Sequence, residues 1–203
     1  ITITENESTP VVTLATSATS IAENAGSSLT LTATSSIVAD EDITVSISTS
    51  GTGTEGTDYS TISDITISAG ATTGTASFTP TDDSVYEGNE TGIVAISGVS
   101  GADAAESGSQ SVTITITENE SSPTVTLTTS ATSIAENAGT SLTLTATISQ
   151  EADEDVTVNL GAAGTSTNGT DYGSLSSITV SAGATTGTVS FTPSDDSVYE
   201  GNE

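Results

Sequence analysis

Ser28-Leu-Thr-Leu-Thr-Ala-Thr-Ser35 alternates apolar residues with threonine. Successive side chains of a β-strand point to opposite faces of a sheet, so Leu29, Leu31 and Ala33 share one face and the threonines share the other. Apolar residues at every second position are typical of a half-buried strand. This stretch therefore predicts a β-strand with one face in a core and the other in solvent.

The same alternation recurs along the chain at short, even intervals. Within the first 120 residues it predicts seven strands, at 11–16, 28–35, 43–49, 64–68, 73–79, 92–97 and 111–117. Gly, Asn, Asp and Ser cluster between these segments, and no segment keeps a helical period. Seven such strands in about 110 residues predict an all-β fold, an immunoglobulin-like Greek-key β-sandwich. The Cys and Trp that mark true immunoglobulin domains are missing.

The chain repeats itself with a period of 113 residues. Ile21-Ala-Glu-Asn-Ala-Gly26 returns as Ile134-Ala-Glu-Asn-Ala-Gly139, and Gly56-Thr-Asp-Tyr59 returns as Gly169-Thr-Asp-Tyr172. Asp82-Asp-Ser-Val-Tyr-Glu-Gly-Asn-Glu90 returns at the same offset, ending at Glu203. The offset never changes, so no loop carries an insertion. A repeat of this length is the size of a domain, which predicts tandem sandwich domains.

The boundaries of the repeats follow from one further match. Ile114-Thr-Ile-Thr-Glu-Asn-Glu120 is identical to Ile1-Thr-Ile-Thr-Glu-Asn-Glu7. Residues 1–7 are therefore predicted to be the last strand and linker of a preceding repeat, and residues 8–120 a complete repeat. Residues 121–203 are predicted to be a second repeat that stops before its last strands. We expect the chain to be a window on a longer array.

Charge limits the classes of partner. The 203 residues include 27 acidic side chains and no Lys, Arg or His, which gives a net charge of -27. Phosphate binding needs cationic side chains, so this segment is expected to bind neither nucleic acid nor anionic lipid, and its natural partners are cations. There is no cysteine for a disulfide. No apolar run approaches the roughly 20 residues of a membrane helix, so no membrane insertion is expected.

Many carboxylates fall in loops that a Greek-key sandwich could gather at one end. In the complete repeat they are Glu23, Asp58, Asp82, Asp83, Glu87, Glu90, Glu118 and Glu120. Two carboxylates about 5 Å apart repel by roughly 3 kcal/mol at an effective dielectric of ~20, and no basic residue can neutralise them. Calcium takes 6–8 oxygen ligands, whereas zinc and copper prefer His or Cys. Calcium is therefore the expected ion, and magnesium is the second choice.

The same motifs resemble the Calx-beta domain. The resemblance rests on Ala22-Glu-Asn-Ala-Gly26, Gly56-Thr-Asp-Tyr59, Phe78-Thr-Pro80 with the acidic run after it, and the acidic tripeptide that ends the repeat. It covers the whole chain, as one full copy and most of another. The family includes cytosolic calcium sensors of sodium–calcium exchangers and repeats of bacterial surface proteins, so the resemblance implies a calcium-binding module.

The resemblance also implies a set of calcium ligands. In the first repeat, the positions that match the family's carboxylates are Glu23, Asp58, Asp82, Asp83, Glu87 and Glu90, and the acidic run at the end of the domain is Glu118, Asn119 and Glu120. Asn119 departs from the Asp triplet usual in the sensors, which removes one charge. In the second repeat the matching positions are Glu136, Asp171, Asp195, Asp196, Glu200 and Glu203.

Each of these residues also has a simpler interpretation. Glu23 and Glu136 could be ordinary turn residues, and Asp58 could shape an Asx turn. The run from Glu118 to Glu120 could be a solvated linker. Asp40, Glu41 and Asp42 match no family ligand and are expected to form an exposed turn. Paired carboxylates also occur in glycosidases, but here they lie in loops better explained by a metal, so we expect no enzyme.

Three functions fit the sequence. The first is a calcium-rigidified extracellular repeat in the extender region of a large surface adhesin or matrix protein, with neighbouring repeats of the same chain as partners. The second is a subunit of an extracellular filament or sheath, in which identical chains pack together. The third is a calcium-sensing regulatory module. Near-identical repeats favour the first two, because a sensor needs few, specialised copies. The expected location is the surface or exterior of a bacterial cell.

Overall fold

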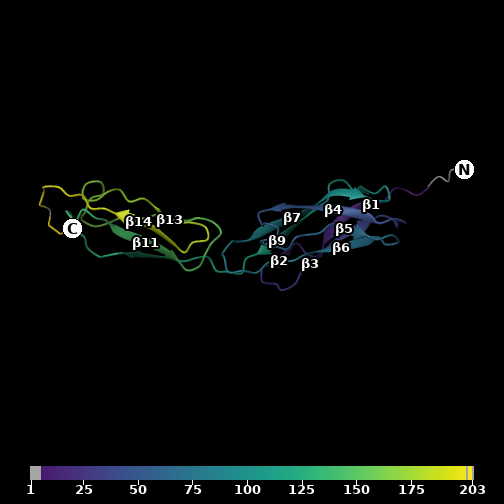
Figure 1. The fold of residues 1–203 in the computed structure, drawn as a ribbon, viewed down its shortest axis with the longest axis horizontal. Helices are drawn as coiled ribbons and strands as arrows, with labels where there is room; N and C mark the ends of the chain where they lie inside the picture. Colours follow the sequence, from purple (N-terminus) through teal and green to yellow (C-terminus); the bar gives the residue numbers. More distant parts are fainter. Residues whose placement is uncertain (1–5, 200, 203) are drawn as a thin grey trace. The chain divides into compact units, whose positions relative to one another are not determined.

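The computed structural model of the chain describes residues 6–199, 201 and 202. All of its regular elements are strands, and they form two compact units (Figure 1). The first unit comprises Ile1–Asp83 and Gly88–Asn119, and the second comprises Ser84–Glu87 and Glu120–Glu203. Among the described residues there is no helix long and apolar enough to cross a lipid bilayer.

The first unit is a sandwich of two sheets. One sheet has the order β6-β3-β1-β8, formed by β6 (Thr73–Phe78), β3 (Leu29–Ser35), β1 (Val11–Thr16) and β8 (Ala105–Glu106). The other has the order β2-β9-β7-β4-β5, formed by β2 (Ser20–Ala22), β9 (Ser111–Thr117), β7 (Glu90–Ser100), β4 (Ile43–Gly51) and β5 (Ile65–Ile67). This confirms the predicted all-β, immunoglobulin-like sandwich.

The core of the first unit is built from the alternating residues. In β3, Leu31 and Ala33 are fully buried while the threonines between them reach the surface or its edge. In β9, Ile114 and Ile116 are buried in the same way. Burial of one such aliphatic side chain contributes about 1.5–3 kcal/mol, so the alternation is the main source of stability. Each of the seven predicted strands is present, with ends that differ by a few residues at most.

Two short strands were not predicted from the sequence. Both β2 and β8 pair in parallel, β2 with β9 and β8 with β1. With three and two residues respectively, they are too short to show an alternating pattern. They matter because β2 brings the beginning of the repeat beside its end, where the acidic tripeptide lies.

An aromatic pair packs under the end of the first unit that carries most of the predicted ligands. The rings of Tyr59 and Phe78 stack with their centroids 4.6 Å apart, and both residues are buried. Gly92 of β7 passes directly over them, because a Cβ on Gly92 would lie 2.7 Å from Phe78 Cε2. Only glycine fits between this strand and the ring.

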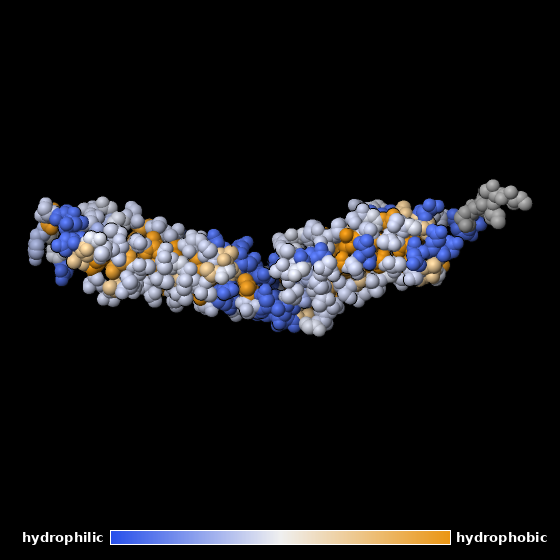
Figure 2. Space-filling model, in the orientation of Figure 1, coloured by the Kyte–Doolittle hydropathy of each residue, from blue (hydrophilic) through white to orange (hydrophobic). Residues whose placement is uncertain are grey.

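The second unit repeats part of this arrangement. One sheet has the order β10-β11-β14, formed by β10 (Val125–Thr129), β11 (Leu142–Ile148) and β14 (Thr186–Phe191). The other pairs β12 (Val156–Val158) with β13 (Ile178–Val180). Its buried core is smaller and centres on Ala146, Ile148, Ile178 and Val180. In the described part of this unit there are no counterparts of β7, β8 and β9. Val125 and Leu127 of β10 are exposed, and hydrophobic patches are visible on this unit in Figure 2.

Candidate metal centre

The pairing of β2 with β9 brings two of the predicted ligands together. Ala22 is the register partner of Thr117, and the next backbone hydrogen bond runs from Glu23 N to Thr117 O at 3.0 Å. Glu23 and Glu118 are the residues that follow these two strands, so parallel pairing brings them out side by side. In the sequence, Glu23 and Glu118 are 95 positions apart.

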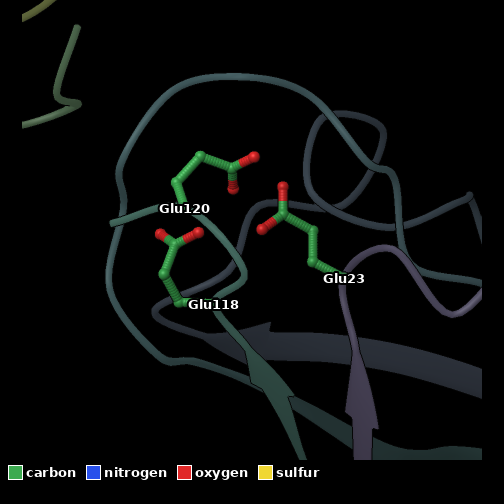
Figure 3. A group of neighbouring side chains, drawn as sticks. All are labelled: Glu23, Glu118 and Glu120. Carbon is green, nitrogen blue, oxygen red and sulfur yellow. The ribbon is translucent and has the colours of Figure 1, made fainter. Parts of the chain in front are cut away.

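Glu120 completes a group of three carboxylates, here called the Glu23 group. One carboxylate oxygen from each of Glu23, Glu118 and Glu120 lies within 4.8 Å of the other two, and in Figure 3 the three side chains point toward a common space. Glu23 is only 5% exposed and the other two are partly buried. Burial strengthens repulsion between the charges, which at this spacing is about 3 kcal/mol per pair at an effective dielectric of ~20.

A second set, the Asp58 group, comprises Asp58, Glu87 and Glu90. Each offers one carboxylate oxygen within 4.8 Å of the others. Asp58 is 9% exposed, and its Oδ2 accepts a hydrogen bond from Thr54 N in a tight turn. This donor lies four residues before Asp58, whereas an Asx turn would use the N–H two residues after it, so the bond is not the Asx turn offered as the simpler interpretation. It fixes the orientation of the Asp58 side chain.

The pKa of Tyr59 reflects the negative charge around the Asp58 group. Burial raises the pKa of the Tyr59 hydroxyl above its ordinary value, a hydrogen bond with Thr49 lowers it, and the charges of Glu55, Asp58 and Glu90 raise it further. Negative charges raise this pKa because they oppose formation of a phenolate beside them. The potential that disfavours a phenolate favours a cation.

Glu118 connects the acidic tripeptide to the loop that carries Glu87 and Glu90. Its Oε2 accepts a hydrogen bond from Gly88 N at 2.7 Å, and its backbone N donates to Asn89 Oδ1 at 3.0 Å. Its Oε1 accepts from Asn119 N at 2.9 Å. The side chain is therefore held in place by backbone donors, which is the kind of preorganisation that a metal ligand needs.

The chemistry of this donor set fits calcium. Calcium binds oxygen at 2.3–2.6 Å, so two ligands on opposite sides of one ion are about 5 Å apart. The oxygens of each group, within 4.8 Å of one another, satisfy that limit. All side-chain donors are carboxylates, and the chain has no His or Cys to favour zinc or copper. Each group supplies three of the 6–8 oxygens that calcium takes, and bidentate carboxylates, backbone carbonyls and water are the usual remainder.

Three predicted ligands of the first repeat lie outside these two groups. Asp82, Asp83 and Asn119 are exposed, and none belongs to a set of three close carboxylates among the described residues. Asp83 instead contributes its backbone, since its N–H donates to Glu23 Oε1 at 3.3 Å. Their side chains remain predicted ligands only.

The predicted ligands of the second repeat are more exposed to solvent than those of the first. Glu136 is exposed, although Asp196 N donates to its Oε1 at 2.9 Å, which repeats the contact between Asp83 and Glu23. Asp171 Oδ2 accepts from Thr167 N, as Asp58 does from Thr54. Asp195 and Asp196 are exposed. Glu200 and Glu203 lie outside the described residues, and the described part of this repeat has no set of three close carboxylates.

Other acidic residues have structural roles that the sequence analysis missed. Glu55 accepts from Thr49 Oγ1 at 2.7 Å and from Ile62 N at 2.6 Å, so it ties a loop to β4. Asp64 accepts from Ile47 N at 3.0 Å, next to an irregularity in the β4–β7 ladder. Asp42, predicted to lie in an exposed turn, is exposed and accepts from Ala69 N at 2.7 Å. These carboxylates act as hydrogen-bond acceptors within the fold, a role that the sequence alone does not show.

Comparison with known families gives one match that spans the chain. The family model described as the Calx-beta domain matches residues 5–120 and again residues 118–203. Comparison with curated protein sequences gives no match.

Solved structures similar to this one include one described as the calcium binding domain CBD12 of CALX1.1, 16% identical with a TM-score of 0.45, which covers 87% of this chain and 74% of that one. A crystal structure described as CBD12 from CALX1.2 is 16% identical, with a TM-score of 0.45, and the match covers 89% of this chain and 74% of that one. The apo-form CBD1 domain of Calx is 16% identical with a TM-score of 0.44, covering 55% of this chain and 98% of that one. A two-domain protein of unknown function from Bacteroides fragilis is 11% identical with a TM-score of 0.39, covering 74% and 68%.

Proposed function

Because the chain belongs to the Calx-beta family, a calcium-binding type of domain, we propose that it is a structural repeat stiffened by calcium outside the cell. In this role it would act as a spacer in the extender region of a larger surface or matrix protein. The observation that carries the proposal is the Glu23 group, three carboxylates held within 4.8 Å in a chain with no basic residue.

The mechanism depends on where Glu118 and Glu120 lie in the chain. They belong to the segment that leaves β9, and only Ser121 and Ser122 separate Glu120 from Pro123 and the next repeat. An ion bound by Glu23, Glu118 and Glu120 would fasten this linker to the strand ends β2 and β9. Without the ion, repulsion among the three charges would favour release of the linker.

The ligand set suits an extracellular setting. Calcium sites of extracellular modules bind with dissociation constants of about 10⁻⁴–10⁻³ M, because the ion is abundant there. Such weak binding is enough to hold a linker at millimolar calcium. The absence of cysteine leaves a metal as the available cross-link between distant parts of a repeat. A regulatory sensor is less well supported, because the two repeats carry the same motifs in the same order.

Small-angle X-ray scattering of the 203-residue chain tests the proposal. In about 2 mM calcium we expect a larger and better-defined maximum dimension than in EGTA, since a fastened linker samples fewer orientations. Cleavage by a Glu-specific protease supplies a second measurement, because trypsin has no site in a chain without Lys or Arg. Calcium should slow cleavage after Glu118 and Glu120. Identical scattering and cleavage in calcium and in EGTA would contradict the proposal.

A further inference from the structure

A tight turn in the second unit, residues 167–172, carries an asparagine directly before a glycine. Asn168 is exposed and pairs with Tyr172 as an isolated parallel bridge. The nitrogen of the next residue, Gly169 N, donates to Tyr172 O at 2.8 Å. Backbone contacts with Tyr172 therefore hold both members of the Asn-Gly pair.

The shape of this turn requires the glycine but not the asparagine. Gly169 has a φ of +84°, in the left-handed region that side chains disfavour. Gly56 occupies the same position of the first repeat with a φ of +89°, and its N–H donates to Tyr59 O at 2.7 Å. The residue before the glycine differs, since the first repeat has Glu55 where the second has Asn168.

The side chain of Asn168 can turn toward the backbone nitrogen that follows it. Within the described residues, the side-chain amide of Asn168 takes part in no hydrogen bond. Its counterpart Glu55 is held in place, because it accepts from Thr49 Oγ1 and from Ile62 N. The space beside Gly169 is open, since a Cβ built there would meet no atom within 4 Å.

We propose that Asn168 is a site of spontaneous deamidation, and that opening of the 167–172 turn sets its rate. In this reaction Gly169 N loses its proton and forms a bond to Cγ of Asn168, and the side-chain nitrogen leaves as ammonia. Water then opens the cyclic succinimide. Cleavage between the ring nitrogen and Cγ gives aspartate, and cleavage between the ring nitrogen and the α-carbonyl carbon gives isoaspartate. Water is the only co-reactant.

The glycine distinguishes Asn168 from other exposed asparagines. Asn24 and Asn137 precede alanine and Asn159 precedes leucine, and all three are exposed. A side chain on the following residue hinders attack by its nitrogen and restricts the backbone angles that the attack requires. Asn168 is the only asparagine of the sequence that precedes glycine. Exposure alone would predict similar rates at these four residues, whereas the glycine predicts one fast site.

The closed turn opposes the reaction. Gly169 N must leave Tyr172 O before it can attack Cγ, so the reaction proceeds from the fraction of molecules in which the turn is open. Further bonds keep it closed, because Asp171 N donates to Thr167 O at 3.0 Å and Asp171 Oδ2 accepts from Thr167 N. The rate of deamidation is therefore expected to report local opening of this turn.

The two products change the turn in different ways. Aspartate adds a negative charge three positions before Asp171, at the place where the first repeat has Glu55. Isoaspartate carries the main chain through the side-chain carbon, which adds one atom to the backbone path between residues 168 and 169. That change is expected to break the pairing with Tyr172, whose ring stacks on Phe191 at 4.9 Å.

Peptide mapping by mass spectrometry tests where the reaction occurs. The folded chain is incubated at mildly alkaline pH in EGTA, so the result does not depend on calcium binding. We expect a gain of about 1 Da in the peptide that contains Asn168. Its rate should exceed the rates at Asn24, Asn137 and Asn159 about tenfold or more, because a hindered nitrogen raises the barrier. Equal rates at the four asparagines would overturn the proposal.

Two substitutions of Asp171 separate opening of the turn from the effect of charge. Asp171→Ala and Asp171→Asn both remove a negative charge that opposes loss of the Gly169 proton, but only alanine also removes the oxygen that accepts from Thr167 N. We expect the folded alanine variant to deamidate about threefold or more faster than the asparagine variant, as loss of one hydrogen bond implies. In guanidinium chloride the two variants should react equally.

Circular dichroism of both variants checks that the rates are compared between folded chains. Equal rates of the two folded variants would overturn control by the turn, because charge alone would then account for any acceleration. Since EGTA is present throughout, neither result depends on the proposed role of calcium.

Discussion

Asp83 N donates a hydrogen bond to Glu23 Oε1 across 60 positions of sequence, and Asp196 N makes the same contact with Glu136 Oε1 in the second repeat. Two loops that the sequence analysis expected at one end of the sandwich therefore meet in both repeats. The contact engages Oε1 of each glutamate with a backbone N–H of the other loop. Glu23 is buried and Asp83 is exposed, so the loop of Asp83 contributes a backbone donor to Glu23 and not a third close carboxylate.

Neutralising Glu118 should weaken calcium binding. Glu118→Gln removes one charge of the Glu23 group but keeps the shape of the side chain and an oxygen that can accept from Gly88 N. We expect the dissociation constant for the tightest site to rise about tenfold or more, equivalent to a loss of at least 1.4 kcal/mol, as measured by isothermal titration calorimetry. Asp40→Asn, an equal change of charge at an exposed residue outside both groups, is the matched control and should leave the affinity within twofold.

Calcium should raise the stability of the first unit. An ion that binds only the folded state stabilises it by about 2.7 kcal/mol at one hundred times its dissociation constant. For a domain of this size, that corresponds to roughly 10 °C or more in the melting temperature, measured by circular dichroism. Sodium chloride at matched ionic strength separates binding from general screening. If it raised the melting temperature as much as calcium does, specific ligation would be wrong.

Gly92→Ala should destabilise the first unit through packing. The new Cβ would lie 2.7 Å from Phe78 Cε2, so the ring and the strand must separate. Overpacking of this kind costs about 1–3 kcal/mol. Gly98→Ala, in the same strand, places its Cβ 4.0 Å from the nearest neighbour and should have a much smaller effect. Urea unfolding of the two variants gives the comparison, and equal losses would show that strand propensity, not the ring, dominates.

Asp64→Ala should lower stability without changing calcium affinity. Asp64 accepts from Ile47 N at 3.0 Å and from Ser46 Oγ at 3.1 Å, and its removal leaves the first of these donors in the strand without that acceptor. We expect a loss of about 1–2 kcal/mol in the free energy of unfolding. Calorimetric titration of the same variant with calcium should match the unsubstituted chain. A large loss of affinity would place Asp64 in the metal site after all.

The fold could be predicted from the sequence because burial in a sandwich leaves a local pattern. Leu31 and Ala33 in β3, or Ile114 and Ile116 in β9, alternate with threonine whether or not the partner strand is known. The three-residue strand β2 leaves no such pattern, and its parallel pairing with β9 depends on residues about a hundred positions away. Short parallel pairs are therefore visible only in three dimensions.

The sequence predicted where the candidate site lies, but it could not predict which acidic residues place a carboxylate oxygen in it. The family motif pointed to Glu23, Asp58, Glu87, Glu90, Glu118 and Glu120, and these carboxylates form the two close groups of the structure. The motif cannot distinguish Asp83, which contributes a backbone N–H, from a residue that contributes an oxygen. It also gives no sign that Glu55 and Asp64 are engaged by backbone donors, because such contacts depend on the path of the loops.

The pairing of β2 with β9 also sets the order in which a repeat can fold. Ile21 and Thr117, which touch through a hydrogen bond of 3.4 Å, are 96 positions apart. During synthesis, the edge at Ser20–Ala22 emerges long before its partner, so every repeat passes through a stage in which that edge is open. In a chain of near-identical repeats, the wrong copy of β9 fits this edge as well as the right one. Completion of one repeat before the next one emerges would therefore keep neighbouring repeats from exchanging strands.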